Sequence, residues 1–567
     1  WYQRRVRGTR RMDKKAYLVG SGVGNLCAAI LLIRDAKFQG KDIIMLEDMK
    51  IAGGSCDAAG NPEQGYICRG GRMFNEPTYE CFQPILKDVP SLINKGQSVY
   101  KDIIDYFVDH KTYATTRLVN KIGQRQDVVC MGFSQRDRMQ FLALFTAPET
   151  QIQNTKIDEW FSPEFFETNF WYLWQTVFAF QTWSSAIELK RYCHRFLHLF
   201  DSIDTLTGIM KTPFNQYDSL IKPMQQYLMD QGVKPMFGCR VTNVQIAEKQ
   251  GKYTATKLFY TEAGKEKTIE IRDQDICLIQ NGCMTDGSTL GSTTTSARMN
   301  DDAPSFKLWE KIAAQHPGKF GNPAPFYKNI NESMWQSFTV TCNNKLWERF
   351  CAYQECKGPG HGLLTTFRDS NWLMSFSLLF QPHYHEQPDN VKVFWGYGLF
   401  PNKVGNFVNK RMIDCTGQEI FEELCGHCRI PMSETVGTKI IPCFMPYIDS
   451  QFQPRNIADR PLPVPKGATN FGFVSQFVEI PNDVVFTVEY SARAAQTAVY
   501  QLMGIKTKIP GVSRYDLNPL VMIRGVIKAY KGPQAVEARR GRKCCLCKLA
   551  VAGLVGVGAA YIAKKYM

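Results

Sequence analysis

The sequence predicts an α/β fold: a discontinuous parallel-sheet domain, a mixed α+β domain, an aromatic-rich helical segment and a C-terminal helical tail. Three observations lead to this prediction. A short apolar run, AYLVG, enters a glycine-rich turn and continues into an apolar helix pattern, LCAAILLIRD. Apolar strand patterns that would complete the same sheet, DIIMLE and DICLIQNG, lie far apart in the chain. The 567 residues are too many for one hydrophobic core, so several sub-domains are expected.

The first element is a strand, glycine turn, helix and strand unit around GSGVGN, the run that starts at Gly20. Gly20 permits a tight turn and Gly22 lets the backbone approach a pyrophosphate, while the following helix offers free N–H groups to that anion. Gly24 and Asn25 complete the motif, with Asn25 in the place of the usual last glycine. Glu47 ends the second strand 27 residues after Gly20, where it would accept hydrogen bonds from ribose hydroxyls. The pattern predicts a Rossmann-like dinucleotide site; a glycine-rich turn without a ligand is the alternative.

A second glycine-rich stretch, GGSCDAAGNPEQGYICRGGRMFNEPTYEC, follows from residue 53. It resembles the signature of the oleate hydratases, once called myosin-cross-reactive antigens. The stretches WSSAIELKRYCHRF, IDTLTGIMKTPFNQYDSLIKPMQQYL, QNGCMTDGSTLG, MPYIDSQFQPR and SQFVEIPNDVVFTVEYSARAAQTAVY also resemble that family, in its order, so the resemblance covers roughly residues 12–505. It implies FAD as the cofactor and hydration of a cis double bond in a free unsaturated fatty acid, of the oleate to 10-hydroxystearate type.

The resemblance extends the expected flavin site over three pieces of chain. Val241 lies on a predicted strand whose backbone could pair with adenine, and the segment that contains Phe477 and Val484 would close over the ribityl and isoalloxazine groups. The further residues expected at the cofactor are Gly54, Ser55, Arg69, Gly70, Gly71 and Asn281.

Seven segments follow from these assignments. They are a basic N-terminal extension (1–15), a first FAD-binding part (16–110), an aromatic-rich helical lid or substrate segment (111–204), a second FAD-binding part (205–300), a substrate-binding domain (301–470), a third FAD-binding part (471–505) and a C-terminal basic tail with an apolar membrane-associating segment (506–567).

Hydration of an isolated double bond needs a proton donor on one carbon and an oriented water on the other. The resemblance implies Tyr192, in RYCHRF, as the donor; a buried, hydrogen-bonded structural tyrosine is the alternative. Many family members carry Glu directly after RGGR, where a carboxylate would activate the water, but this chain has Met73. Asn75 or Glu76 could supply a replacement oxygen. Arg72 is a candidate for binding the fatty carboxylate, with flavin as its alternative partner. No metal site is expected.

Residues 160–183 contain eleven aromatic side chains among 24 residues. Aromatic residues dominate protein cores, so core packing is one interpretation. The other is an apolar tunnel wall or lid for a long acyl chain, and the two can hold for different residues.

The net charge of +15 lies entirely in the two ends of the chain. Residues 1–15 carry seven bases and one acid, and residues 524–567 carry ten bases and one acid, which leaves 51 of each between them. A neutral central region argues against nucleic acid as a partner. The C-terminal end combines ARRGRKCCLCK with fifteen uncharged residues, 549–563, fewer than the roughly 20 that span a bilayer. We expect peripheral association with an anionic membrane surface, with Cys544, Cys545 and Cys547 open to acylation; a terminal helix docked on a partner subunit is the alternative.

No secretory signal is recognisable, so a cytoplasmic protein with mostly free thiols among its nineteen cysteines is expected. Cys425 and Cys428 spell a CGHC motif, but EIFEELCGHCRI is a helical pattern, which favours buried thiols over disulfide exchange. Members of the family are often dimers, which makes a homodimer a further expectation.

Three functions remain open on the sequence. The leading hypothesis is the FAD-dependent hydratase. A flavin oxidoreductase of the amine oxidase or desaturase kind shares the cofactor domain, and a membrane-associated lipid-binding flavoprotein that lost catalysis with the acid at Met73 is the non-enzymatic alternative.

Overall fold

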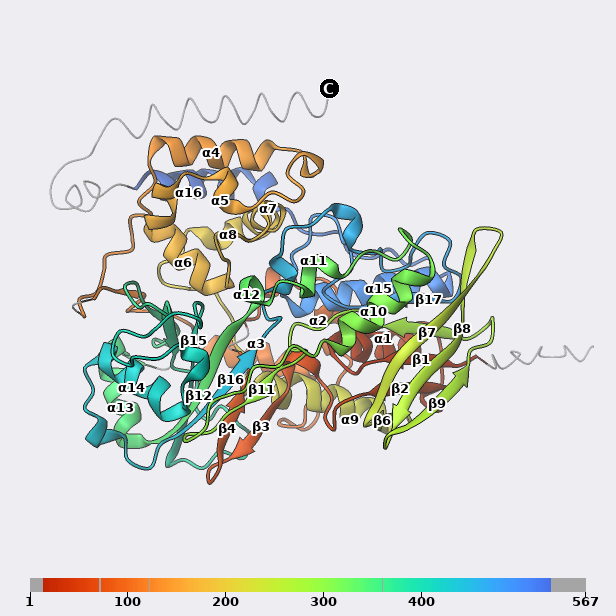
Figure 1. Cartoon of the computed structure of the whole chain (residues 1–567), viewed down its shortest axis with the longest axis horizontal. Helices are drawn as coiled ribbons and strands as arrows, with labels where there is room; N and C mark the ends of the chain where they lie inside the picture. Colours follow the sequence, from red (N-terminus) through yellow and green to blue (C-terminus); the bar gives the residue numbers. More distant parts are fainter. Residues whose placement is uncertain (1–13, 71–72, 122, 359, 532–567) are drawn as a thin grey trace, which may run out of the picture.

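The computed structural model describes residues 14–70, 73–121, 123–358 and 360–531, and Figure 1 shows their arrangement. A five-stranded sheet, entirely parallel, has the order β17–β10–β1–β2–β6. Its strands are β1 (Ala16–Val19), β2 (Ile43–Glu47), β6 (Lys234–Phe237), β10 (Ile276–Ile279) and β17 (Phe471–Phe473). The sheet draws on three distant stretches of chain, which confirms the predicted discontinuous α/β fold.

Helices cover the parallel sheet, as its continuous apolar strands require. Helix α1 (Val23–Arg34) packs along α15 (Val488–Met503), and both are largely buried. The shorter helices of this region are α2 (Phe82–Leu86), α3 (Val99–Asp109) and α9 (Lys222–Asp230). A three-stranded antiparallel sheet of β7 (Cys239–Lys249), β8 (Lys252–Glu262) and β9 (Lys265–Glu270) lies beside it, with α10 (Pro304–Gln315) against β7.

The second large sheet has seven strands in the order β11–β16–β12–β15–β14–β13–β5. They are β5 (Leu118–Val119), β11 (Thr289–Leu290), β12 (Trp335–Asn343), β13 (Thr365–Phe367), β14 (Met374–Ser377), β15 (Val391–Gly398) and β16 (Lys439–Met445). The hairpin of β3 (Ala58–Asn61) and β4 (Gly65–Cys68) packs on β12, where the Cys68 N–H donates to Thr339 Oγ1 at 3.0 Å. Through this hairpin, the second glycine-rich stretch runs from the five-stranded parallel sheet to the seven-stranded sheet.

One face of the seven-stranded sheet is covered by α13 (Asn344–Gln354) and α14 (Gly417–Cys428). Phe394 of β15 points to that face, whereas Trp395 and Tyr397 belong to a different apolar cluster, because Trp395 follows Phe394 and alternate residues of a strand face opposite sides. The short helices α11 (Ala324–Tyr327) and α12 (Ile330–Ser333) precede β12.

The aromatic-rich segment forms a helical group of its own (Figure 1). It consists of α4 (Gln135–Thr146), α5 (Ile157–Trp160), α6 (Asn169–Phe178), α7 (Ala186–Arg195) and α8 (Leu197–Phe200). A later part of the chain, α16 (Pro519–Tyr530), joins this helical group. It packs on α8, and its Lys528 forms an ion pair of 2.7 Å with Asp204.

Cys425 and Cys428 lie on α14 as buried free thiols, as the helical pattern predicts. Burial raises the pKa of Cys425 to about 12. Within the described residues no helix is long and apolar enough to cross a membrane. The apolar run 549–563 and the three cysteines beside it lie outside the described residues.

Candidate functional site

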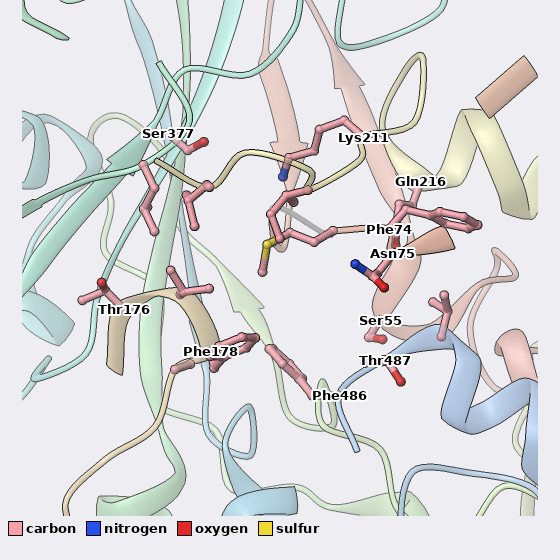
Figure 2. Close-up of a pocket in the computed structure, with 18 of the residues that line it drawn as sticks. Ser55, Phe74, Asn75, Thr176, Phe178, Lys211, Gln216, Ser377, Phe486 and Thr487 are labelled. Atoms are coloured by element: carbon pink, nitrogen blue, oxygen red, sulfur yellow. The ribbon is translucent and has the colours of Figure 1, made fainter. Parts of the chain in front are cut away.

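Two neighbouring cavities, which share part of their lining, are formed by residues of the two large sheets and the segments between them. The first, here called the turn cavity, has a volume of about 350 Å³ and is lined by the glycine-rich turn, the end of β2, the start of β7 and residues 475–477. The second, the apolar cavity, has a volume of about 140 Å³ and mostly apolar walls (Figure 2). Both are lined by the same five residues at their junction: Ser55, Cys56, Arg69, Gln476 and Val488.

The turn after β1 brings backbone N–H groups to the wall of the turn cavity. Gly20 has φ +87°, a conformation that favours glycine, and its N–H donates to the Leu46 carbonyl at 2.7 Å. Gly22 caps the N-terminus of α1, and its N–H donates to Gln280 Oε1 at 3.0 Å. Both glycines line the cavity, as the motif predicts. In this structure both N–H groups donate to the protein itself, that of Gly20 to Leu46 and that of Gly22 to Gln280.

Gly24 and Asn25 lie behind the turn and not on the cavity wall. A Cβ on Gly24 would come within 2.0 Å of the Val474 carbonyl oxygen, so this glycine allows α1 to pack against the end of β17. The Asn25 amide donates to the Val19 and Gly20 carbonyls, both at 2.8 Å. These two residues shape the turn, and neither is placed to touch a ligand.

Glu47 stands at the carboxyl end of β2 and lines the turn cavity. Its carboxylate accepts from the Ser21 N–H and Ser21 Oγ, both at 2.7 Å, and from the Met49 N–H at 2.9 Å. Val241 on β7 lines the same end of the cavity. The acid and the strand that the sequence singled out for an adenosine therefore meet in one place.

The second glycine-rich stretch contributes to the junction of the cavities. Gly54 lines the turn cavity, Gly70 lines the apolar cavity, and Ser55 and Arg69 line both. Arg69 Nε is held at 2.8 Å from Asp57 Oδ1, which fixes the guanidinium at the junction. Gly71 and Arg72 lie outside the described residues.

Of the three remaining residues predicted at the cofactor, one lines the turn cavity and two are buried in the protein. Phe477 lines the turn cavity. Asn281 is buried behind it and donates to the Phe477 carbonyl at 3.1 Å, so its contact is with the protein. Val484 is 1% exposed and lines neither cavity.

Tyr192 projects from α7 to the wall of the apolar cavity. It is 1% exposed, its ring lies 5.2 Å from that of Phe178, and its hydroxyl donates to the Val485 carbonyl. Burial raises its pKa well above the usual value, so the phenol is protonated at neutral pH. The hydroxyl is thus a protonated, hydrogen-bonded group at the wall of the cavity.

Position 73 brings a thioether to the apolar cavity. Met73, Phe74 and Asn75 line it, whereas Glu76 starts a 3-10 turn (Glu76–Thr78) and lies on neither cavity. Of the two oxygens considered as replacements for the missing acid, the structure brings only the Asn75 amide to the wall (Figure 2).

Lys211, Gln216 and Thr487 also line the apolar cavity and were not singled out from the sequence. Figure 2 shows the Lys211 side chain on the side opposite the rings of Phe178 and Phe486. Burial lowers the pKa of Lys211 to about 8. The only sequence signal was its place in IMKTPFNQY, a stretch that resembles the family, because a single Lys carries no motif of its own.

The aromatic segment supplies both core and wall. Phe165, Trp171 and Trp174 belong to the core, whereas the end of α6 and the residue after it, with Phe178 and Ala179, line the apolar cavity. Core packing is confirmed for the first three residues, and the acyl-chain wall stays a prediction for the two that line the cavity.

Two relatives of named activity are similar to this chain over nearly its whole length. The chain is 36% identical over 534 residues to an oleate hydratase of Streptococcus pyogenes serotype M49 (strain NZ131), covering 91% of this chain and 89% of the relative. It is 33% identical over 563 residues to a linoleate hydratase of Lactiplantibacillus plantarum, covering 92% and 99%.

Among solved structures, cyclohexylamine oxidase from Brevibacterium oxydans IH-35A is similar with a TM-score of 0.50 and 11% identity, over 87% of this chain and 99% of that one. This likeness concerns the fold. Residues 13–500 match the MCRA family. The chain therefore belongs to the MCRA family.

Proposed function

We propose that the protein is an FAD-dependent fatty acid hydratase that adds water to a cis double bond of a free unsaturated fatty acid. The observation that carries this proposal is that the two cavities share part of their walls. An apolar cavity with a buried phenol on its wall, Tyr192, shares Ser55 and Arg69 with a cavity built on a glycine turn. The oleate and linoleate hydratases among the relatives support oleate-like acids as the substrate class.

The residues of the turn cavity fit a flavin dinucleotide. Gly20 and Gly22 have no side chains of their own at the cavity wall, and the Gln280 amide lies against both, 2.5 Å and 2.8 Å from where a Cβ would be. The N-terminus of α1 favours an anion there, and Glu47 offers carboxylate oxygens at the strand end. Ser55 and Arg69 would face the flavin ring at the junction. When bound, the flavin would supply an electron-rich surface beside the double bond.

In this proposal the chain's own residues move one proton and orient one water. The Tyr192 hydroxyl gives its proton to one alkene carbon while the water oxygen bonds to the other, and the proton that the water loses returns to the phenolate. Asn75 is the group proposed to orient the water in place of a carboxylate at position 73, because its amide is on the cavity wall. Without a base at position 73, no side chain there removes a proton from the water, which is only oriented. We therefore expect the hydration reaction to be retained but slower.

Two cations are proposed for the fatty carboxylate. Lys211 lines the apolar cavity and is half-buried, so its ammonium would pair with a carboxylate bound there. Arg72, the candidate from the sequence, lies outside the described residues.

Mass spectrometry of products after incubation with oleate, FAD and a reductant in heavy-oxygen water tests the function. A hydroxy acid that has gained one labelled water supports the hydratase. Flavin reduction by the substrate with consumption of oxygen would instead identify an oxidoreductase. Binding of oleate without a product from any cis-unsaturated acid would identify a lipid-binding flavoprotein, the alternative that Met73 favours.

We also propose that the helical group of α4 and α16 associates peripherally with an anionic membrane surface. The two helices are neighbours, because Arg138 Nε donates to the Ala529 carbonyl at 3.2 Å. Large apolar side chains are exposed on both: Leu520, Ile527, Met139 and Leu142. The sequence continues after α16 with a basic cluster and an apolar run in residues 532–567. Stable anchoring needs two signals: the exposed apolar side chains are the first, and this segment supplies the second.

Flotation with vesicles that contain anionic lipid tests this association. We expect Leu520→Ser with Ile527→Ser to lower the bound fraction, and added salt to weaken binding further because it screens the basic cluster. Val436→Ser is the matched control, since Val436 is exposed on a different part of the surface, just before β16. Equal binding to neutral and anionic vesicles would contradict the proposal.

A further inference from the structure

The acceptor of the Tyr192 hydroxyl lies on a strap of chain, residues 479–487, that has no helix or strand. The strap begins two residues after the wall of the turn cavity at Phe477 and ends where α15 starts at Val488. Its last residues, Phe486 and Thr487, line the apolar cavity. The strap therefore connects the cofactor side of the site to the phenol.

The start of the strap is fixed to α7 by a buried ion pair. Glu479 Oε1 accepts from Arg191 Nη2 at 2.6 Å, and its other oxygen lies 2.9 Å from Arg455 Nη2. Arg191 also donates to the carbonyl of the next strap residue, Ile480, at 3.4 Å. Glu479, Arg191 and Arg455 are all buried.

The middle of the strap is fixed to the same helix one turn further along. Asp483 is fully buried and lies 3.3 Å from Arg195 Nε and 2.9 Å from Arg493 Nε. Arg195 is held in turn by Glu80, at 3.0 and 2.9 Å. Arg191 and Arg195 are four residues apart on α7 and so share one face. Two ion pairs from this helix thus hold the strap, and the Tyr192 hydroxyl reaches it two residues beyond Asp483, at the Val485 carbonyl.

The strap keeps a backbone conformation that needs such support. Phe486 has φ +66° and Asn482 has φ +65°, in the left-handed region that side-chain-bearing residues rarely adopt. Residues in this region persist where the surroundings over-determine them, and they gather at functional sites. Buried ion pairs are on average no more stabilising than apolar residues of the same volume. A buried cluster of this size therefore points to placement of the strap and not to stability alone.

We propose that Glu479 and Asp483 are positioning residues for Tyr192: through Arg191 and Arg195 they hold the Val485 carbonyl against the phenol and so fix the direction of its O–H. This inference rests on the proposed function, in which Tyr192 gives the proton. The ion pairs touch neither substrate nor cofactor, and they act on the reaction only through the phenol.

Asp483→Asn and Glu479→Gln test the proposal in the full-length holoprotein, with the second variant as the milder one should the first not fold. We expect each to lower kcat for hydration by tenfold or more with little change in KM or in FAD affinity. Glu423→Gln is the matched control: Glu423 is equally buried and accepts three backbone N–H groups of residues 406–408, on α14 and away from both cavities. It should leave kcat and KM unchanged.

A double-mutant cycle separates positioning from general damage. In a Tyr192→Phe background, Asp483→Asn should have no further effect on the residual rate, because the group it positions is gone. Independent, additive losses would overturn the proposal.

The same cycle in urea unfolding decides the inference even if the protein hydrates nothing. In the otherwise unchanged chain, Tyr192→Phe should lower the urea midpoint of unfolding, because the hydrogen bond to Val485 is lost. In the Asp483→Asn or Glu479→Gln chain, Tyr192→Phe should leave the midpoint unchanged, because that hydrogen bond is no longer held in place. Absence of product from the unchanged chain would sink the proposed function, whereas equal midpoint shifts in both backgrounds would sink the positioning role.

Discussion

The turn cavity and the apolar cavity differ in how the chain builds them. The glycine turn, the start of α1 and the end of β2 come from 32 consecutive residues, 16–47, and each demands a particular backbone shape. The apolar cavity has no such continuous stretch: the residues that line it alone include Met73 and Phe486, more than 400 positions apart, and they are held together by two sheets and the helical group. A site formed by consecutive residues with particular backbone conformations can be recognised in the sequence. A site formed by packing of distant side chains leaves almost no sequence pattern.

The largest expected effect is on the glycine turn, where Gly24→Val should prevent stable folding. A Cβ at position 24 would lie 2.0 Å from the Val474 carbonyl oxygen. Relieving this clash would require α1 or the end of β17 to move, which would disrupt the packing of the helix on the parallel sheet. We expect a loss of about 3 kcal/mol or more in the free energy of unfolding, at the upper end of overpacking costs. Urea unfolding and FAD titration measure it. Gly511→Val is the control, because nothing lies within 4 Å of its Cβ position; similar losses in both variants would break the comparison.

A second prediction concerns the apolar cavity, where Tyr192→Phe should spare the fold and remove the chemistry. We expect hydration to slow by roughly 100- to 10,000-fold, the usual worth of a positioned acid. Stability should fall by about 1 kcal/mol, because the Val485 carbonyl loses its donor.

Tyr384→Phe is the matched control for this variant. Tyr384 is also buried and donates to a carbonyl, that of Ile67 at 2.7 Å, but lines neither cavity. Product formation that survives in Tyr192→Phe as it does in Tyr384→Phe would remove the phenol from the mechanism.

The smallest effect is expected for Lys211→Met, which should weaken fatty acid binding without changing the fold. A hydrogen bond to a charged group is worth about 1.5–3 kcal/mol, so KM should rise roughly tenfold or more. The pKa of Lys211 is lowered to about 8, so its ammonium loses a proton above that pH while the fatty acid stays ionised. KM of the unchanged protein should therefore rise above pH 8, and KM of Lys211→Met should stay flat there.

Lys211→Arg sharpens this test because arginine keeps its charge at every pH used. It should restore binding and abolish the rise above pH 8. A rise of the same size in all three proteins would assign the pH dependence to another group.

Some elements could be predicted from sequence because their signals are local. The parallel strands β1, β2 and β10, the start of α1 after Gly22, and the helical nature of the CGHC segment follow from apolar runs, glycine placement and helical periodicity. The same local rules placed Gly20, Gly22 and Glu47 at one cavity. They could not show that Gly24 faces the protein, because that depends on Val474 at the end of β17, 450 residues further along the chain.

The sequence alone determined the α/β class, the glycine turn between β1 and α1 and, through the resemblance of its motifs, the family. Only the tertiary structure decided that Asn75 and not Glu76 stands on the cavity wall, that Lys211 lies there half-buried, and that Val484 belongs to the core. The physical reason is range: backbone turns and strand patterns are fixed by neighbours in sequence. The environment of a cavity side chain, its burial, pKa and hydrogen-bond partner, is set by residues hundreds of positions away.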